Sequence, residues 1–177
     1  MEGVSSGVLA GLLLVAAWGD IQRHRIPNIL ILTGLGLAII CGAWRAGFSG
    51  LLSAGGGFVL GLLIFLPFYM LRALGAGDVK LMAVVGAFLG PGGLIGAMFG
   101  TFLAGGVMAL LLALHAGAVG QMMRNIKAML LGGFIDVRMK QMPMMDANPQ
   151  SVGKLPYAVA IAAGTLGYLA LRYGGWI

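Results

Sequence analysis

The stretch Gly75-Ala76-Gly77-Asp78-Val79-Lys80 places a carboxylate and a lysine between two long apolar runs, Leu51–Leu71 and Val79–Gly90. An ionisable side chain in an apolar segment is costly, at about 2.5–3.5 kcal/mol in the middle of a membrane and less near its surface. Acids are also scarce, because Asp and Glu together number five in 177 residues. We therefore expect Asp78 to have a chemical role and look for a second group that would make it useful.

The composition is that of an integral membrane protein. Hydrophobic residues make up 60% of the chain and charged residues 9%, whereas a soluble domain has about 25% charged residues. The net charge is +6, but the basic residues lie in short loops between apolar runs, so the positive-inside rule accounts for them without a nucleic-acid partner. The single cysteine, Cys41, excludes an internal disulfide and a cysteine-based zinc site.

The apolar runs predict an all-α bundle of six transmembrane helices in a single domain, residues 1–177, because a crossing takes about 20 mostly apolar residues. The run 79–90 is short, and a re-entrant half-helix is the alternative interpretation of it. The predicted spans are 4–19, 28–44, 51–71, 79–90, 94–119 and 155–171, with a cytoplasmic loop over 120–153.

The first part of that loop has the pattern of a basic amphipathic helix lying in the headgroup region. Arg124 and Lys127 lie off its apolar face, and we expect this segment to help admit a substrate helix. The residues that share the apolar face are Met122, Met123, Ile126, Met129 and Leu130.

The distribution of basic residues predicts the orientation of the bundle. With the N-terminus and the C-terminus outside, six crossings leave only Arg45 and Arg172 outside and place the other nine Lys and Arg residues in the cytoplasm. That asymmetry is strong, and removing the crossing at 79–90 would move the long basic loop outside. Six crossings are therefore the favoured topology.

Glycine is abundant, with 32 residues, and small residues four apart let membrane helices approach closely. Chance matches caused by this abundance are the alternative for any single pair. The pairs with this spacing are Gly7/Gly11, Gly57/Gly61, Gly86/Gly90 and Gly96/Gly100.

Asp20 ends the first apolar run, and in this topology it lies at the same membrane face as Asp78. Two carboxylates in a partly dry site share a proton. One can then act as a general base on water while the other polarises a peptide carbonyl, which is aspartic protease chemistry without metal or cofactor. Gly75 and Gly77 would allow unusual backbone angles and the close approach of a substrate backbone. The structural alternative is that each aspartate merely marks a helix boundary.

Other ionisable residues carry weaker expectations. Lys80 lies two positions after Asp78, so the two side chains do not face each other on a helix. Interfacial snorkelling is favoured for Lys80 over a phosphate-anchoring or substrate-loop role. His24 is expected to be solvated and His115 to pack at the interface, and because no pair has helical ligand spacing we expect no metal site.

Three motifs resemble those of the type IV prepilin peptidase family, membrane aspartic proteases with a GxGD motif. These are Asp20 followed by Ile26-Pro27-Asn28, the stretch Gly75–Met82, and Lys154-Leu155-Pro156-Tyr157-Ala158-Val159-Ala160. The resemblance runs from the first span to the last. It implies that Asp20 and Asp78 cleave the leader peptide of prepilins at the cytoplasmic face of the bacterial inner membrane.

The short chain looks like the TadV/CpaA-type peptidases of tight-adherence (Flp) pilus systems. Larger members add a cytoplasmic domain with paired cysteines and many N-methylate the new terminus, whereas this chain has neither the insertion nor the pair, which argues against methyltransferase activity. The implied partners are prepilins and the lipid bilayer, and a homo-oligomer is left open. The alternatives are a non-catalytic pilus or secretion assembly subunit and a small proton-coupled transporter, although a transporter would have acids at several membrane depths.

Overall fold

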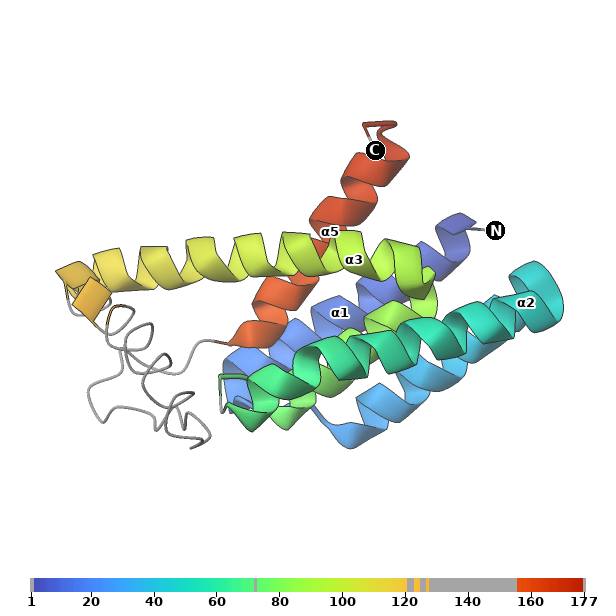
Figure 1. The fold of residues 1–177 in the computed structure, drawn as a ribbon, viewed down its shortest axis with the longest axis horizontal. Helices are drawn as coiled ribbons and strands as arrows, with labels where there is room; N and C mark the ends of the chain where they lie inside the picture. Colours follow the sequence, from blue (N-terminus) through green and yellow to red (C-terminus); the bar gives the residue numbers. More distant parts are fainter. Residues whose placement is uncertain (1, 72, 121–122, 125–126, 128–155, 177) are drawn as a thin grey trace, which may run out of the picture.

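The computed structural model describes residues 2–71, 73–120, 123–124, 127 and 156–176. The helices with described bounds are α1 (Glu2–Arg23), α2 (Asn28–Met70), α3 (Ala76–His115) and α5 (Tyr157–Tyr173) (Figure 1). No strand occurs within these ranges, so the predicted all-α class is confirmed. Most of the predicted loop 120–153 and of its amphipathic segment lies outside the described residues.

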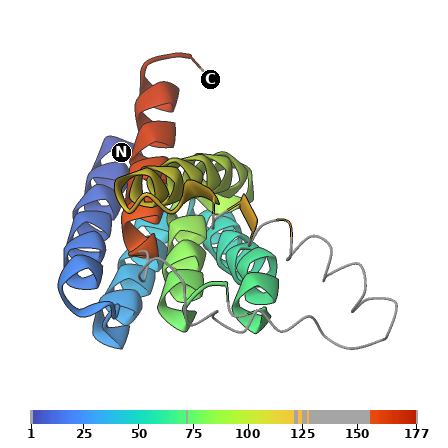
Figure 2. The same ribbon diagram turned by 90° about the vertical axis from the view of Figure 1, so that its left-hand side faces the viewer.

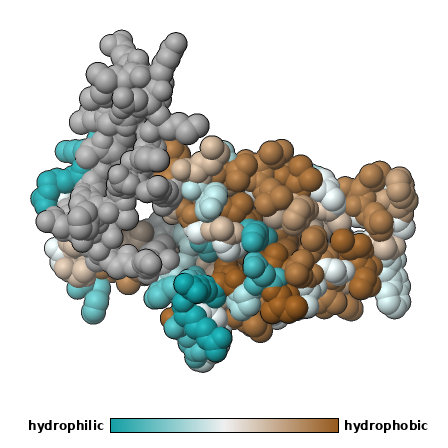
Figure 3. Space-filling view, turned by 90° about the horizontal axis from the view of Figure 1, so that it is seen from below, coloured by the Kyte–Doolittle hydropathy of each residue, from teal (hydrophilic) through white to brown (hydrophobic). Residues whose placement is uncertain are grey.

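Three of these helices are long and apolar enough to cross a membrane, namely Gly3–Arg23, Asn28–Met70 and Ala76–His115. Figure 3 shows apolar side chains over most of the face that it draws outside the grey segment. The predicted span 28–44 and all but the last residue of 51–71 fall in α2, and 79–90 and 94–119 both start in α3. The described part of the chain therefore has four helices where the sequence predicted six separate ones.

Helix α2 consists of two segments that fold back on each other. Ala46 and Gly47 leave the helical conformation, and Gly47 has a φ of 55°, which glycine adopts at no steric cost. A Cβ on Gly50 would overlap the carbonyl oxygen of Gly42, so the two backbones touch beside the turn. This is the position of the turn that the sequence predicted between the second and third spans.

Helix α3 reverses in the same way at Gly90, whose φ is 71°. Pro91 follows, and it cannot donate a helical hydrogen bond. The segment before this break forms the centre of the bundle, because Leu81–Val85 are fully buried. A helical segment that is apolar all round is expected in such a position, which explains how a run too short for an ordinary span is accommodated.

The glycine pairs explain how closely the segments pack. Added Cβ atoms on Gly57 and Gly61 would strike the backbone of Gly86 and of Met82–Ala83, and one on Gly100 would strike Gly164. Three of the predicted pairs therefore contribute to close helix contacts, as small residues do in membranes. Gly7 and Gly11 have nothing within 4 Å of an added Cβ, so this pair makes no such contact in the structure.

Helices α1 and α5 lie side by side and run in opposite directions (Figure 2). The hydroxyls of Ser6 and Tyr173 are 2.7 Å apart at one end, and Asp20 bonds to Ala158 at the other. The bundle thus has one end near the two aspartates and an opposite end near Ser6. Asp20 was expected to begin a polar loop, but α1 continues as a helix to Arg23.

Candidate active site

Asp20 lies in the last turns of α1 and is only 8% exposed. Its Oδ2 accepts a hydrogen bond of 3.1 Å from the backbone N–H of Ala158. Helix α5 begins after Pro156 and has no side-chain cap of its own, so Asp20 satisfies one of the N–H groups that every helix start leaves unpaired. The carboxylate also lies at the positive end of the helix dipole.

Asp78 is the third residue of α3 and is partly buried. Its Oδ2 accepts a hydrogen bond of 3.0 Å from the N–H of Gly75, whose carbonyl oxygen accepts one of 3.1 Å from the N–H of Asp78. The aspartate therefore caps the start of its own helix. Both aspartates are helix-boundary residues, as the structural alternative proposed, and each is fixed through Oδ2 by one backbone N–H.

Gly75 and Gly77 have ordinary backbone conformations, and their lack of a side chain leaves space for neighbouring groups. Gly75 has φ −77° and ψ 153°, and the φ of Gly77 is not positive. The expectation that these glycines adopt unusual backbone angles was therefore wrong. A Cβ on Gly75 would lie 3.1 Å from Oδ2 of Asp78, and one on Gly77 would lie 3.2 Å from Cβ of Ile26. The observed clearance is for the aspartate and for the Ile26-Pro27-Asn28 segment, while clearance for a substrate stays a prediction.

Three helix ends converge at this end of the bundle. The carboxyl groups of Asp20 and Asp78 are close enough to interact electrostatically, and Asp78 also interacts with the phenol of Tyr157. The end of α1 and the starts of α3 and α5 therefore form one site. We predicted no role for Tyr157 from the sequence. The one feature that could have indicated a role is its position, since it places an aromatic hydroxyl at the start of the last apolar run.

Lys80 connects the two aspartate motifs. Its Nζ donates a hydrogen bond of 3.1 Å to Oδ1 of Asn28, the first residue of α2. Both residues are exposed. From the sequence we considered interfacial snorkelling and a phosphate-anchoring or substrate-loop role for this lysine. The contact adds a further role, which is to hold the start of α2 beside the start of α3.

His115 ends α3, at the other end of that helix from Asp78, whereas the backbone N–H of His24 donates a hydrogen bond of 2.8 Å to the carbonyl oxygen of Asp20. His24 and His115 are both exposed. Within the part of the chain that the structure describes, no three residues among His, Cys, Asp and Glu come together as a metal site would require. The arrangement is thus a pair of carboxylates with backbone donors and a phenol.

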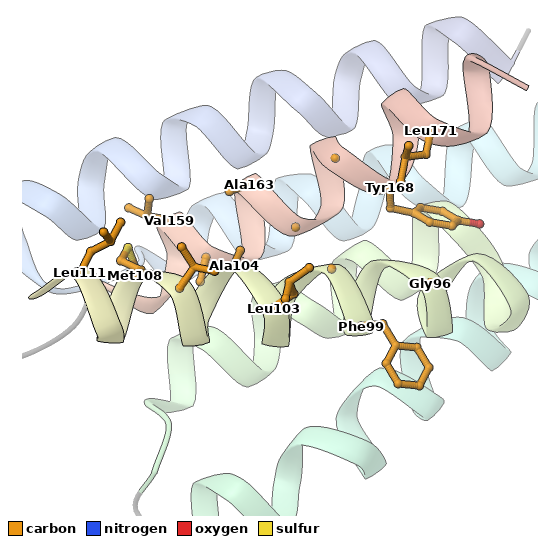
Figure 4. A pocket seen from close by; sticks show the side chains of 15 residues that line it. Gly96, Phe99, Leu103, Ala104, Met108, Leu111, Val159, Ala163, Tyr168 and Leu171 are labelled. Carbon is orange, nitrogen blue, oxygen red and sulfur yellow. The ribbon is translucent and has the colours of Figure 1, made fainter. Parts of the chain in front are cut away.

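A large groove lies elsewhere, between the second segment of α3 and α5, with a volume of about 670 Å³ (Figure 4). It runs from Tyr168 and Leu171 toward Val159 and Leu111 (Figure 4). Its lining includes no charged residue. The groove thus offers no carboxylate among its described lining residues, and we place the candidate site at the aspartates.

Fold and site together define a helical transmembrane protein with two interacting carboxylates at one end of the bundle. Residues 7–110 match the family model of the type IV leader peptidase family, and this match covers more than half of the chain. The chain belongs to the type IV leader peptidase family, which confirms the family that the three motifs predicted. The matched residues include Asp20 and Asp78 and end before α5. No curated protein and no solved structure matched the chain.

Proposed function

We propose that the protein is an aspartic endopeptidase that removes the leader peptide of type IV, Flp-like prepilins, with Asp20 and Asp78 as its catalytic pair. One observation supports this most directly. Two motifs far apart in the sequence bring their carboxylates to the same end of the bundle, within range for the charge of Asp20 to act on Asp78. Both aspartates also fall within the residues that match the leader peptidase family.

The proposed chemistry uses a water molecule held between the two carboxyl groups. One negative charge opposes the ionisation of its neighbour, so the pair holds a single proton. The ionised member takes a proton from the water as it attacks the scissile carbonyl, and the protonated member donates to the carbonyl oxygen. When the tetrahedral intermediate collapses, the proton taken from the water passes to the leaving amine, and the proton given to the carbonyl oxygen returns to the carboxylate that donated it.

The backbone contacts suggest which atoms do this work. Oδ2 of Asp20 is held by Ala158 and Oδ2 of Asp78 by Gly75, so we assign the two Oδ1 atoms to water and substrate. Because one oxygen of each carboxylate is held in place, the second oxygen of the same group cannot rotate freely. Such positioning matters because general acid–base catalysis contributes about 10²–10⁴-fold only when the group is within hydrogen-bond reach.

We further propose six membrane crossings, with α2 and α3 each crossing twice and both termini outside. The fold-backs at Gly47 and Gly90 support this, because each returns the chain toward the end from which it came. Arg23, Arg25 and Lys80 belong to the helix ends and loop at the aspartate end. The positive-inside rule then puts the site at the cytoplasmic face of the bacterial inner membrane.

Cleavage by the purified chain tests this function. The protein is reconstituted in vesicles with a Flp-type prepilin, and mass spectrometry identifies the new N-terminus. We expect one cut just before the apolar helix of the pilin and none in vesicles without the protein. A non-catalytic assembly subunit or a transporter would leave the prepilin intact, so intact prepilins across several Flp-type substrates would contradict the proposal.

A further inference from the structure

A second, polar cavity of about 130 Å³ lies at the end of the bundle opposite the aspartates. Residues of α1, α2, α3 and α5 all line it, so the packing of the whole bundle shapes it. Leader cleavage, as proposed above, uses none of them. The polar lining residues are Ser5, Ser6, Arg45, Ser53, Arg172 and Tyr173.

Two guanidinium groups from different helices meet at this cavity. Arg45, at the end of the first segment of α2, donates a hydrogen bond of 3.3 Å to the carbonyl oxygen of Phe88. A guanidinium has five N–H donors in a planar fork, so this bond leaves Arg45 able to bind a second acceptor. Arg172 enters from the last turn of α5. Two such forks around one small cavity favour an anion with several oxygens.

The break in α3 lies beside two of the lining residues. A Cβ on Gly90 would lie 2.5 Å from Oγ of Ser53, and one on Gly93 would lie 3.8 Å from Nη1 of Arg172. Ser5 is only 6% exposed and still lines the cavity, which places a hydroxyl in its wall.

Three exposed aromatic residues lie close in sequence to the lining residues Arg45 and Tyr173. Trp44 is 75% exposed and directly precedes Arg45, Phe48 is 76% exposed and follows Arg45 by three residues, and Trp176 is 81% exposed and follows Tyr173 by three residues. Tryptophan concentrates at the level of lipid headgroups in membrane proteins. We therefore infer that the cavity lies near the level of the phosphates when the chain is in a membrane.

We propose that this cavity binds the phosphate group of an anionic phospholipid, held by Arg45 and Arg172. The volume has room for about four waters at about 30 Å³ each, which suits one phosphate and excludes an acyl chain. The exposed apolar surface around Trp44 and Phe48 would contact the acyl chains outside the cavity. The site does not depend on leader cleavage.

Thermal unfolding of the delipidated, detergent-solubilised full chain tests this. Three probes are compared: dihexanoyl phosphatidylglycerol, dihexanoylglycerol as the same molecule without phosphate, and inorganic phosphate. We expect the phospholipid alone to raise the melting temperature at low concentration. In Arg45→Gln and Arg172→Gln its apparent affinity should fall about tenfold, as expected when a charged hydrogen-bond donor is lost. Arg23→Gln, which removes a positive charge at the other end, should match the wild type.

One further variant keeps the test decisive. Arg45→Lys retains the positive charge if Arg45→Gln unfolds, and it should bind more weakly than the wild type because the planar fork is lost. If inorganic phosphate stabilised the protein as much as the phospholipid does, the cavity would still be a phosphate site, but its ligand would not be a lipid. Equal stabilisation by dihexanoylglycerol, or unchanged binding in both arginine variants, would overturn the site.

Discussion

The backbone N–H of Ala158 donates a hydrogen bond of 3.1 Å to Oδ2 of Asp20, across a separation of 138 residues. This contact joins the end of α1 to the start of α5. It also gives Asp20 two separable properties, a structural one as the cap of α5 and, in our proposal, a catalytic one as half of a pair with Asp78. Substitutions at Asp20 can separate the two because an amide retains an acceptor oxygen and loses the acid–base chemistry.

Asp20→Asn should therefore fold almost as stably as the wild type, whereas Asp20→Ala should lose stability. Asparagine can still accept from Ala158, but alanine leaves the start of α5 uncapped, which costs about 0.5–2 kcal/mol. Thermal unfolding in detergent measures the difference, with Glu2→Gln as the carboxylate control at the opposite end. Equal melting temperatures for Asp20→Asn and Asp20→Ala would show that the cap contributes nothing.

Gly77→Ala should lower both stability and cleavage. The new Cβ would lie 3.2 Å from Cβ of Ile26, so the segment before α2 must shift, at a cost of about 1–3 kcal/mol for overpacking. Ile26→Ala in the same chain removes the outer atoms of that side chain and should restore part of the loss. Gly106→Ala is the matched control, because an added Cβ there has nothing within 4 Å. Wild-type behaviour of Gly77→Ala would show that this close approach is unimportant.

Lys80 and Asn28 should act as a coupled pair. Their hydrogen bond is exposed, so its loss should reduce kcat/KM by about fivefold at most, equivalent to about 1 kcal/mol. We expect Lys80→Ala, Asn28→Ala and the double variant to be impaired to the same extent in the vesicle cleavage assay. Losses that simply multiply in the double variant would mean that the two residues act independently.

The helical architecture was predictable because it follows from local properties. Apolar runs give the helices, and the turn near Arg45 and the break near Pro91 follow from glycine and proline conformations. Gly57, Gly61 and Gly100 also predicted close packing between helices. The sequence did not show that Leu81–Val85 would occupy the centre of the bundle, since an apolar run facing lipid and one facing protein look the same.

The candidate site was predictable only where a motif marks it. Asp20 and Asp78 stood out as rare carboxylates with motif neighbours, and the structure places them within range of each other's charge at one end of the bundle. The cap on α5 and the Lys80–Asn28 bond were missed because each joins residues with no local periodic relation. The extension of α1 to Arg23 was missed for a related reason, because the burial of Asp20 against α5 is a tertiary effect.

The central claim is that Asp20 and Asp78 together perform cleavage, and one measurement tests it most directly. Asp20→Asn, Asp78→Asn and wild type are reconstituted in equal amounts with a Flp-type prepilin, and leader removal is followed by mass spectrometry. Each variant retains the acceptor for its backbone donor, so folding and abundance should be unchanged while cleavage falls below detection, with Glu2→Gln cleaving as wild type. Full cleavage by either asparagine variant would contradict the catalytic pair.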